Sequence, residues 1–116
     1  MLKRTMNSFV FAWHGLVTVW KEELNFRIEV FISFFVIFYL VWFKFSFSES
    51  VACIIGITLV LISEIINTAV EDLCNKVEPN HDVFIGKIKD TMGAFVLISV
   101  LGALAIGVLV FYNHFL

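Results

Sequence analysis

Three long apolar segments constrain the fold of this chain more than any other feature. They cover residues 28–43, 51–70 and 92–112. Each is close to the roughly 17–25 residues that a helix needs to cross a lipid bilayer. Because the chain is 60% hydrophobic and only 16% charged, little is left over for a water-soluble domain. The sequence therefore predicts an all-α integral membrane protein with three transmembrane helices, in a single domain over residues 1–116.

The distribution of lysine and arginine predicts how these spans are oriented. Of the eight Lys and Arg residues, only Lys44 lies in the 44–50 turn between the first two spans. Since positive charge is enriched on the cytoplasmic side of membranes, we expect the N-terminus and the 71–91 loop to face the cytoplasm. The short turn predicts that the first two spans are antiparallel neighbours. We expect no removable secretion signal, because no small-residue cleavage pattern follows the first apolar segment.

Residues 5–25 carry a helical pattern of another kind. Apolar side chains recur there at offsets of three and four: Phe9, Trp13, Leu16, Val17, Trp20 and Leu24. Polar residues lie between them, and tryptophan suits the headgroup layer of a bilayer. The pattern predicts an N-terminal amphipathic helix on the membrane surface.

A polar stripe at the end of the second span is the strongest functional signal. At about 100° per residue, five polar side chains fall within a stripe roughly 60–80° wide on one helix face. They are Glu64, Asn67, Thr68, Glu71 and Asn75. Glu64 follows thirteen residues without a charge, so it should lie at or inside the membrane boundary. An ionised carboxylate costs several kcal/mol there unless it is paired or solvated.

Further carboxylates precede the first span. Glu23 and Arg27 have the favourable i,i+4 order of a helical ion pair, although a solvated helix turn would show the same pattern. We expect Glu23, Glu29, Glu64 and Glu71 to gather at the cytoplasmic face. Carboxylate oxygens suit Mg²⁺ that carries a nucleotide phosphate, and a half-desolvated carboxylate can take a proton from an alcohol. Phosphoryl transfer, an ion or proton relay, and polar helix packing all remain open on the spacing alone.

Other functional classes find no support in the sequence. There is no Gly-rich phosphate loop, nucleophile elbow or zinc motif. Net charge is −2 with no basic run, so we expect no nucleic-acid partner. Cys53 and Cys74 should lie roughly 30 Å apart on one helix, too far to bridge. His14, His81 and His114 are scattered, which favours surface or interface positions over metal ligation.

Three features predict local structure near the third span. Pro79 disfavours helix at the preceding residue, so the second span should end at or before Glu78. Asp90 is placed to serve the first turn of the third span, as its N-cap or as an acid near its positive end. Ser99, Ala103 and Gly107, four residues apart, form a small-residue face suited to close helix packing.

Four short motifs follow one another along the chain. They are AWHGL at 12–16, NFRIE at 25–29, EIINTAVE at 64–71 and GKIKD at 86–90. Their sequence and order resemble the prokaryotic diacylglycerol kinase family of small integral-membrane lipid kinases, which includes undecaprenol kinases. The resemblance covers nearly the whole chain. Its most specific element is the Glu-x-x-Asn-x-x-x-Glu motif with the later Lys-Asp pair.

The resemblance implies transfer of the γ-phosphate of MgATP to the primary hydroxyl of a membrane lipid alcohol. Diacylglycerol, giving phosphatidic acid, is the expected acceptor, and undecaprenol, giving undecaprenyl phosphate, is the alternative. The resemblance also implies a homotrimer in the bacterial cytoplasmic (inner) membrane, with active sites shared between neighbouring copies at the cytoplasmic face. Mg²⁺ would be the only cofactor, with ATP as co-substrate.

Roles for individual residues follow from the same resemblance. Glu64 would be the general base, and Asn67 would help to hold the site. Glu23 and Glu71 would bind the Mg²⁺ of ATP. The remaining nucleotide contacts would come from Arg4, Asn80, His81, Asp82, Lys89 and Asp90, and the lipid contacts from Arg4, Glu29 and Glu64.

The sequence departs from the family pattern at two positions. Asn75 stands where many members have Asp, and Phe11 stands where some have Tyr. The first change removes a carboxylate from the rim of the site, and the second removes a hydroxyl. We expect activity to survive both.

Overall fold

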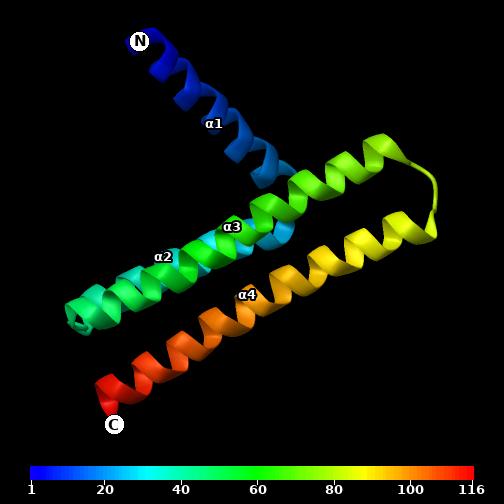
Figure 1. Ribbon diagram of the computed structural model, residues 1–116. Coiled ribbons are helices and arrows are strands. Elements are labelled where there is room, and N and C mark those ends of the chain that lie inside the picture. Colours follow the sequence, from blue (N-terminus) through cyan, green and yellow to red (C-terminus); the bar gives the residue numbers. More distant parts are fainter.

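The computed structural model describes all residues from 1 to 116, as four helices without a strand. The helices are α1 (Leu2–Glu22), α2 (Leu24–Trp42), α3 (Phe47–Val77) and α4 (Val83–Phe115), as labelled in Figure 1. The last three, of 19, 31 and 33 residues, are long and apolar enough to cross a membrane. The fold class is therefore the predicted one, an all-α membrane protein with three spans and an N-terminal helix.

The helices extend well beyond the apolar segments. At 1.5 Å per residue, α3 is about 46 Å long and α4 about 50 Å, against a hydrocarbon thickness of about 30 Å. The predicted 71–91 loop is wrong, because only residues 78–82 are irregular. No glycine or proline interrupts residues 71–77, so α3 continues as a polar helix until Pro79 stops it. Its end at Val77 agrees with the limit that Pro79 predicts.

The N-cap of α4 also differs from the prediction, because α4 begins earlier in the sequence than expected. Asp82 precedes the helix, and its Oδ2 accepts a hydrogen bond from the Ile85 N–H at 3.0 Å. Asp90 lies inside α4, two turns from its start, and caps nothing. A cap acts only at the true helix start, and that start lies nine residues before the first residue of the predicted span.

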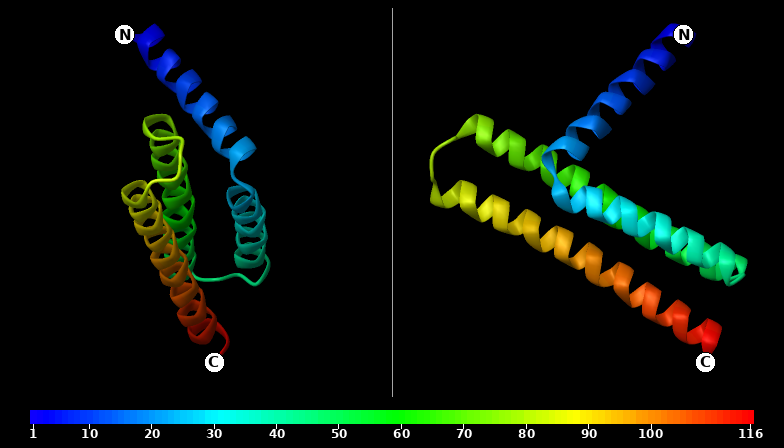
Figure 2. Two further views of the ribbon diagram at one scale, coloured as in Figure 1. Left: turned by 90° about the vertical axis from the view of Figure 1, so that its right-hand side faces the viewer. Right: turned by 180° about the vertical axis from the view of Figure 1, so that it is seen from behind.

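A short turn joins α2 to α3. Lys44 adopts a positive φ of 53° in this turn, and α3 starts at a capping box made by Ser46 and Glu49. The two helices pack against each other in opposite directions, as predicted (Figure 2). We call the end of the helices that carries this turn the outer end, and the end that carries the α3–α4 loop the inner end.

A single extended residue separates α1 from α2. Glu23 has φ −116° and ψ 108°, so α1 ends at Glu22 and not at the predicted residue 25. Helical hydrogen bonding continues on both sides, from Glu23 N to Val19 O at 2.9 Å and from Arg27 N to Glu23 O at 3.4 Å. The chain therefore changes direction at one position, and α1 projects away from the other helices (Figure 1).

The three spans pack unevenly. Helices α3 and α4 lie against each other over much of their length, and a Cβ placed on Gly56 would lie 3.5 Å from Ala103. The predicted small-residue face contributes here through Ala103, whereas a Cβ on Gly107 would meet nothing within 4 Å. Helices α2 and α4 meet only at their outer ends, where Phe115 contacts Tyr39. A cavity of about 760 Å³ lies among α2, α3 and α4.

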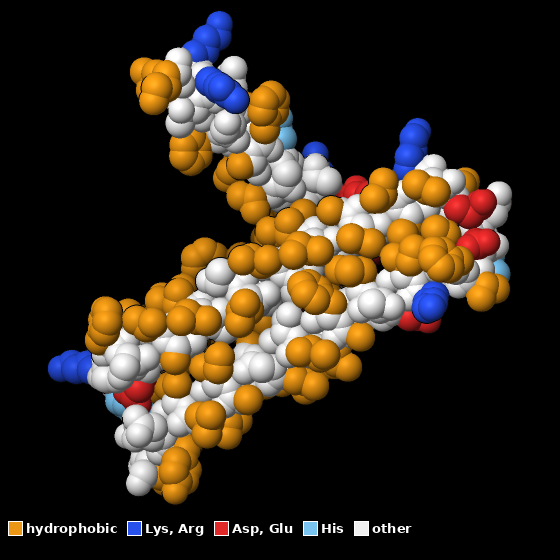
Figure 3. Space-filling view, viewed as in Figure 1, with side chains coloured by type: hydrophobic (Ala, Val, Ile, Leu, Met, Phe, Trp, Pro, Cys, Tyr) orange, Lys and Arg blue, Asp and Glu red, His pale blue; other side chains and the backbone are white.

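The exterior of the chain is apolar. Figure 3 shows hydrophobic side chains over most of the surface of the spans, with charged side chains near the helix ends. Only 10 of 116 residues are buried within the single chain. An exterior of this kind is stable only against lipid or against other copies of the chain.

Candidate active site

An acidic cluster lies where the α1–α2 corner meets α3. Glu23 occupies the corner itself, Glu29 lies in the second turn of α2, and Glu64 and Glu71 belong to the polar stripe of α3. Glu64 is only 2% exposed, and Thr68, one turn further along α3, is also 2% exposed. The structure therefore brings the carboxylates of the α1–α2 corner and the start of α2 together with those of α3, which lies far away in sequence.

Glu64 and Glu29 form the most buried part of this cluster. Their carboxyl groups lie within hydrogen-bonding reach of each other. Glu29 Oε2 is buried and has no other partner. Two carboxylates carry no donor between them, so the contact requires a shared proton or a cation. The pair is thus suited to accept or release a proton.

Glu23 adds a third carboxyl group at the membrane-facing corner. Partial burial raises its pKa, and the negative charges of Glu71 and Glu64 raise it further. A hydrogen bond with the Thr68 side chain opposes these effects by lowering the pKa. The corner therefore concentrates negative charge from α3 around Glu23.

Glu22 and Asp72 extend the cluster towards solvent. A hydrogen bond with Asp72 raises the pKa of the exposed Glu22, with smaller contributions from desolvation and from the nearby charges of Asp72, Glu23 and Glu71. Sequence reasoning assigned no role to Glu22 or Asp72, although each adjoins a residue that it did assign. Their pairing depends on the bend at Glu23, which no sequence pattern marked.

The donor set of this corner fits a magnesium–nucleotide complex. Mg²⁺ is commonly held by one or two carboxylates together with substrate phosphates and water. Glu23 and Glu71 could supply such a pair. No group of three His, Cys, Asp or Glu side chains within the single chain could enclose a metal ion. The phosphates of a nucleotide would thus have to contribute ligands.

Asn67 lies half-buried on α3 between Glu64 and Glu71. Asn75, one turn beyond Glu71 on the same stripe, accepts a hydrogen bond from Lys89 Nζ at 2.7 Å. This bond links α3 to α4 near their inner ends. It also shows that an amide at position 75 is sufficient to hold Lys89.

The other predicted nucleotide contacts lie apart from the acidic cluster in the single chain. Asn80, His81 and Asp82 are exposed in the α3–α4 loop. A shallow depression of about 600 Å³ brings His81 and Asp82 together with Asp90, on the first turns of α4. Arg4 is exposed in the first turn of α1, the part of α1 that lies furthest from the other helices (Figure 1).

The cavity among α2, α3 and α4 was not predicted, because it depends on how the spans pack. Most of its wall is apolar: 13 of its 18 lining residues are hydrophobic. Asn25 and Glu29 line its inner end, and Tyr112 and Leu116 line its outer end. Glu29 thus belongs both to the buried carboxyl pair and to an apolar cavity that runs towards the outer end.

Comparisons with known proteins agree on one family. The profile of the family described as prokaryotic diacylglycerol kinase matches residues 10–111. A protein of Escherichia coli (strain K12) named diacylglycerol kinase is 27% identical over 112 residues, covering 97% of this chain and 92% of the relative. A protein of the same name from Haemophilus influenzae is 27% identical over 112 residues, covering 95% of both chains.

Proposed function

The chain belongs to the prokaryotic diacylglycerol kinase family and is a membrane-bound lipid kinase, and from this premise we propose that it transfers the γ-phosphate of MgATP to the primary hydroxyl of diacylglycerol. The product would be phosphatidic acid. The relatives named diacylglycerol kinase support this acceptor. The observation that carries the proposal is the buried Glu29–Glu64 pair at the polar end of an apolar cavity.

Glu64 is the proposed general base. A lipid alcohol has its tail in hydrocarbon and its hydroxyl near the membrane boundary. The cavity likewise has apolar walls along most of its length and polar side chains, Asn25 and Glu29, at its inner end. With the tail in the cavity, the hydroxyl would approach Glu29 and then Glu64. Glu64 would take the hydroxyl proton as the alcohol oxygen attacks the γ-phosphate, while Glu29 would orient the hydroxyl. The bond between the γ-phosphorus and the bridging oxygen would break, and ADP would leave.

Glu23 and Glu71 are the proposed carboxylate ligands of the magnesium ion, and Asn67 would hold the site between them. When bound, Mg²⁺ would neutralise charge on the transferring phosphate. The cluster by itself repels a nucleotide, so the cation is what makes nucleotide binding at this corner favourable. Lys89 would supply a further positive charge at the inner end.

A homotrimer would complete the site. Arg4 and the residues of the α3–α4 loop lie apart from the acidic cluster of their own chain, so a neighbouring copy would have to supply part of the nucleotide contact. The apolar exterior of the single chain is compatible with such an assembly. We place the acidic cluster on the cytoplasmic side of the inner membrane, where ATP is available, in agreement with the distribution of lysine and arginine.

Replacement of Glu64 tests this function. Glu64→Gln keeps the size of the side chain but cannot accept the proton, so we expect turnover to fall about 100-fold or more. The measurement is transfer of labelled γ-phosphate into extracted lipid by protein purified in detergent. Thr58→Val, on the same helix and outside the cluster, is the control and should keep full activity. Near-full turnover of Glu64→Gln would remove Glu64 as the base.

Competition between acceptors tests the substrate. Diacylglycerol and undecaprenol both present a primary hydroxyl at the membrane boundary, so the same assay should contain both at equal mole fraction. We expect label chiefly in phosphatidic acid. Preferential labelling of undecaprenyl phosphate would assign the alternative acceptor and leave the kinase chemistry intact.

A further inference from the structure

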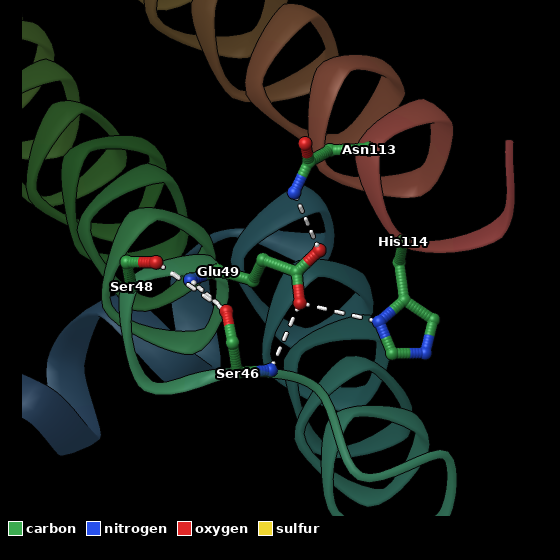
Figure 4. A network of polar contacts seen from close by, with 5 residues as sticks. All are labelled: Ser46, Ser48, Glu49, Asn113 and His114. Atoms are coloured by element: carbon green, nitrogen blue, oxygen red, sulfur yellow. Dashed lines mark hydrogen bonds and ion pairs between the residues drawn. The ribbon is translucent and has the colours of Figure 1, made fainter.

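A polar network at the outer end joins the start of α3 to the end of α4 (Figure 4). Its centre is Glu49, which is only 7% exposed. One carboxylate oxygen accepts a hydrogen bond from the Ser46 N–H at 2.8 Å, and the other accepts one from the Asn113 side-chain amide at 3.1 Å. His114 Nδ1 lies 3.2 Å from the first oxygen. We call Glu49, Asn113 and His114 the outer latch.

Helix capping explains only part of this network. The capping box of α3 needs Ser46 and Glu49 alone, and many helices start this way without help from another helix. Asn113 and His114 come from 64 and 65 residues further along the chain. Hydrogen bonds to a buried carboxylate are stronger than neutral ones, so these two contacts add a specific link between helices.

Aromatic contacts reinforce the link. The His114 ring stacks on Phe45, with centroids 3.8 Å apart and planes 13° from parallel. Phe115 contacts Tyr39 and Phe43 from the end of α2. Because α2 and α4 do not pack against each other elsewhere, these rings are what joins the end of α4 to the end of α2.

The same turn of α4 forms one end of the cavity. Phe111, Tyr112 and Leu116 line the cavity and lie within three residues of Asn113 or His114. The position of this turn therefore sets how far the cavity extends. The outer latch is remote from the proposed chemistry, since Glu49 lies about 22 Å from Glu64 along the axis of α3.

We propose that the outer latch positions the last turn of α4 and thereby fixes the end of the cavity that receives the tail of the lipid alcohol. Glu49, Asn113 and His114 are thus positioning residues for a substrate whose hydroxyl reacts at the opposite end. The identity of the occupant rests on the proposed function. The link between the latch and the last turn of α4 does not.

Hydrogen–deuterium exchange tests the structural half. Asn113→Asp places a second carboxylate opposite Glu49, and since neither group carries a donor, the two can no longer pair. We expect backbone exchange in the last two turns of α4 to accelerate at least tenfold. Adding Glu49→Gln to Asn113→Asp restores a donor–acceptor pair and should restore slow exchange. Ser48→Ala removes a contact to Ser46 only, and is the control that should leave α4 unchanged.

Steady-state kinetics test the positioning half. For Asn113→Asp we expect KM for long-tailed diacylglycerol to rise about threefold or more. KM for MgATP and kcat at saturating lipid should not change, because the acidic cluster is intact. A merely destabilised enzyme would instead lose kcat in proportion to its inactive fraction. The double variant with Glu49→Gln should recover the original lipid KM.

Two results would overturn the proposal. Unchanged exchange in Asn113→Asp would show that the latch does not hold α4, and faster exchange without a selective rise in lipid KM would show that it does not position the substrate. A wild-type protein that labels no lipid alcohol would refute the proposed function instead. The exchange measurement would still decide whether the latch holds α4.

Discussion

The contact between Asn75 and Lys89 shows how a single amide can replace a carboxylate. Asn75 Oδ1 accepts from Lys89 Nζ at 2.7 Å, which is the length of a good charge-assisted bond. The family resemblance implies Asp at this position in many members, and activity was expected to survive the change to Asn. The observed bond shows that the amide can hold the lysine, as a carboxylate would.

Variants at position 75 should separate orientation from charge. Asn75→Asp should retain activity, with a stability change within about 1 kcal/mol for an exposed ion pair. Asn75→Leu cannot accept a hydrogen bond, so Lys89 becomes mobile, and we expect KM for MgATP to rise several-fold. The measurement is the ATP dependence of lipid phosphorylation at saturating lipid. Equal KM values for Asn75→Leu and the wild type would exclude the orienting role.

Glu23 makes stability depend on pH in a direction opposite to that of an ion-paired carboxylate. Its pKa is raised above the ordinary value of 4.5, first by burial and then by Glu71 and Glu64. A raised pKa in the folded state means that its favourable contribution is complete below pH about 4.5 and is lost as pH rises through the raised value. Thermal unfolding in detergent should therefore occur at lower temperature at neutral pH than at pH 5.

Glu23→Gln is the variant that isolates this effect. It should stabilise the protein at pH 7 by up to about 1 kcal/mol, and it should flatten the pH dependence. Mg²⁺ should stabilise the wild type more than this variant, since the variant lacks one of the two proposed metal ligands. If the variant shows the same pH profile as the wild type, Glu23 is not the source of the effect.

At the scale of helices, the close approach of α3 to α4 depends on a small residue. A Cβ on Gly56 would lie 3.5 Å from both Ala103 and Ile106, which is ordinary van der Waals contact. The site therefore has room for one methyl group but not for a larger side chain. Gly56 also lines the cavity, so a larger side chain there would enter the space proposed for the lipid tail.

Substitutions at Gly56 should follow this limit. Gly56→Ala should be neutral or stabilising by up to about 1 kcal/mol, because alanine favours helix. Gly56→Leu should destabilise by about 1–3 kcal/mol through overpacking, and should also raise KM for the lipid. Chemical denaturation and lipid kinetics measure the two effects. Gly102→Leu is the control, since a Cβ there meets nothing within 4 Å; equal effects at both positions would contradict the packing argument.

The helices also show which parts of the structure could be predicted from the sequence. Apolar length predicted three spans, and Pro79 predicted where α3 ends, because both signals act locally. The polar stripe placed residues up to Asn75 on the helix, which the structure confirms, whereas the helical course of residues 83–91 was missed, because their charged residues interrupt the apolar signal. The burial of Glu64 was predictable from its charge-free flank. Its pairing with Glu29 and the network at Glu49 were not, because they depend on how the helices pack.

For the whole molecule, the two ends of the bundle differ in composition and in proposed task. The inner end carries the acidic cluster and the α3–α4 loop, and the outer end carries aromatic rings around a single buried carboxylate. The long axis of the bundle thus separates proton and phosphate chemistry from the place where a lipid tail would end. The proposed chemistry uses ATP, and it therefore requires that the inner end face the cytoplasm.

Site-directed labelling tests that orientation. In a background of Cys53→Ala and Cys74→Ala, Ser48→Cys places a thiol at the exposed outer turn and Asn80→Cys places one in the exposed inner loop. A membrane-impermeant maleimide added to intact spheroplasts should label the first variant at once. The second should react only after permeabilisation. The reverse pattern would place the acidic cluster outside and remove its access to ATP.

Glu23 sets the direction of α1 through its backbone and contributes a carboxyl group to the acidic cluster. Two backbone torsions there decide where the first twenty-two residues travel, and the side chain on the same α-carbon belongs to the acidic corner. A substitution that alters the torsions, such as Glu23→Pro, would redirect the N-terminal arm and carry Arg4 with it. Glu23→Gln would leave the arm where it is. The two changes would therefore distinguish the effect of misplacing Arg4 from the effect of losing a carboxylate ligand for the cation.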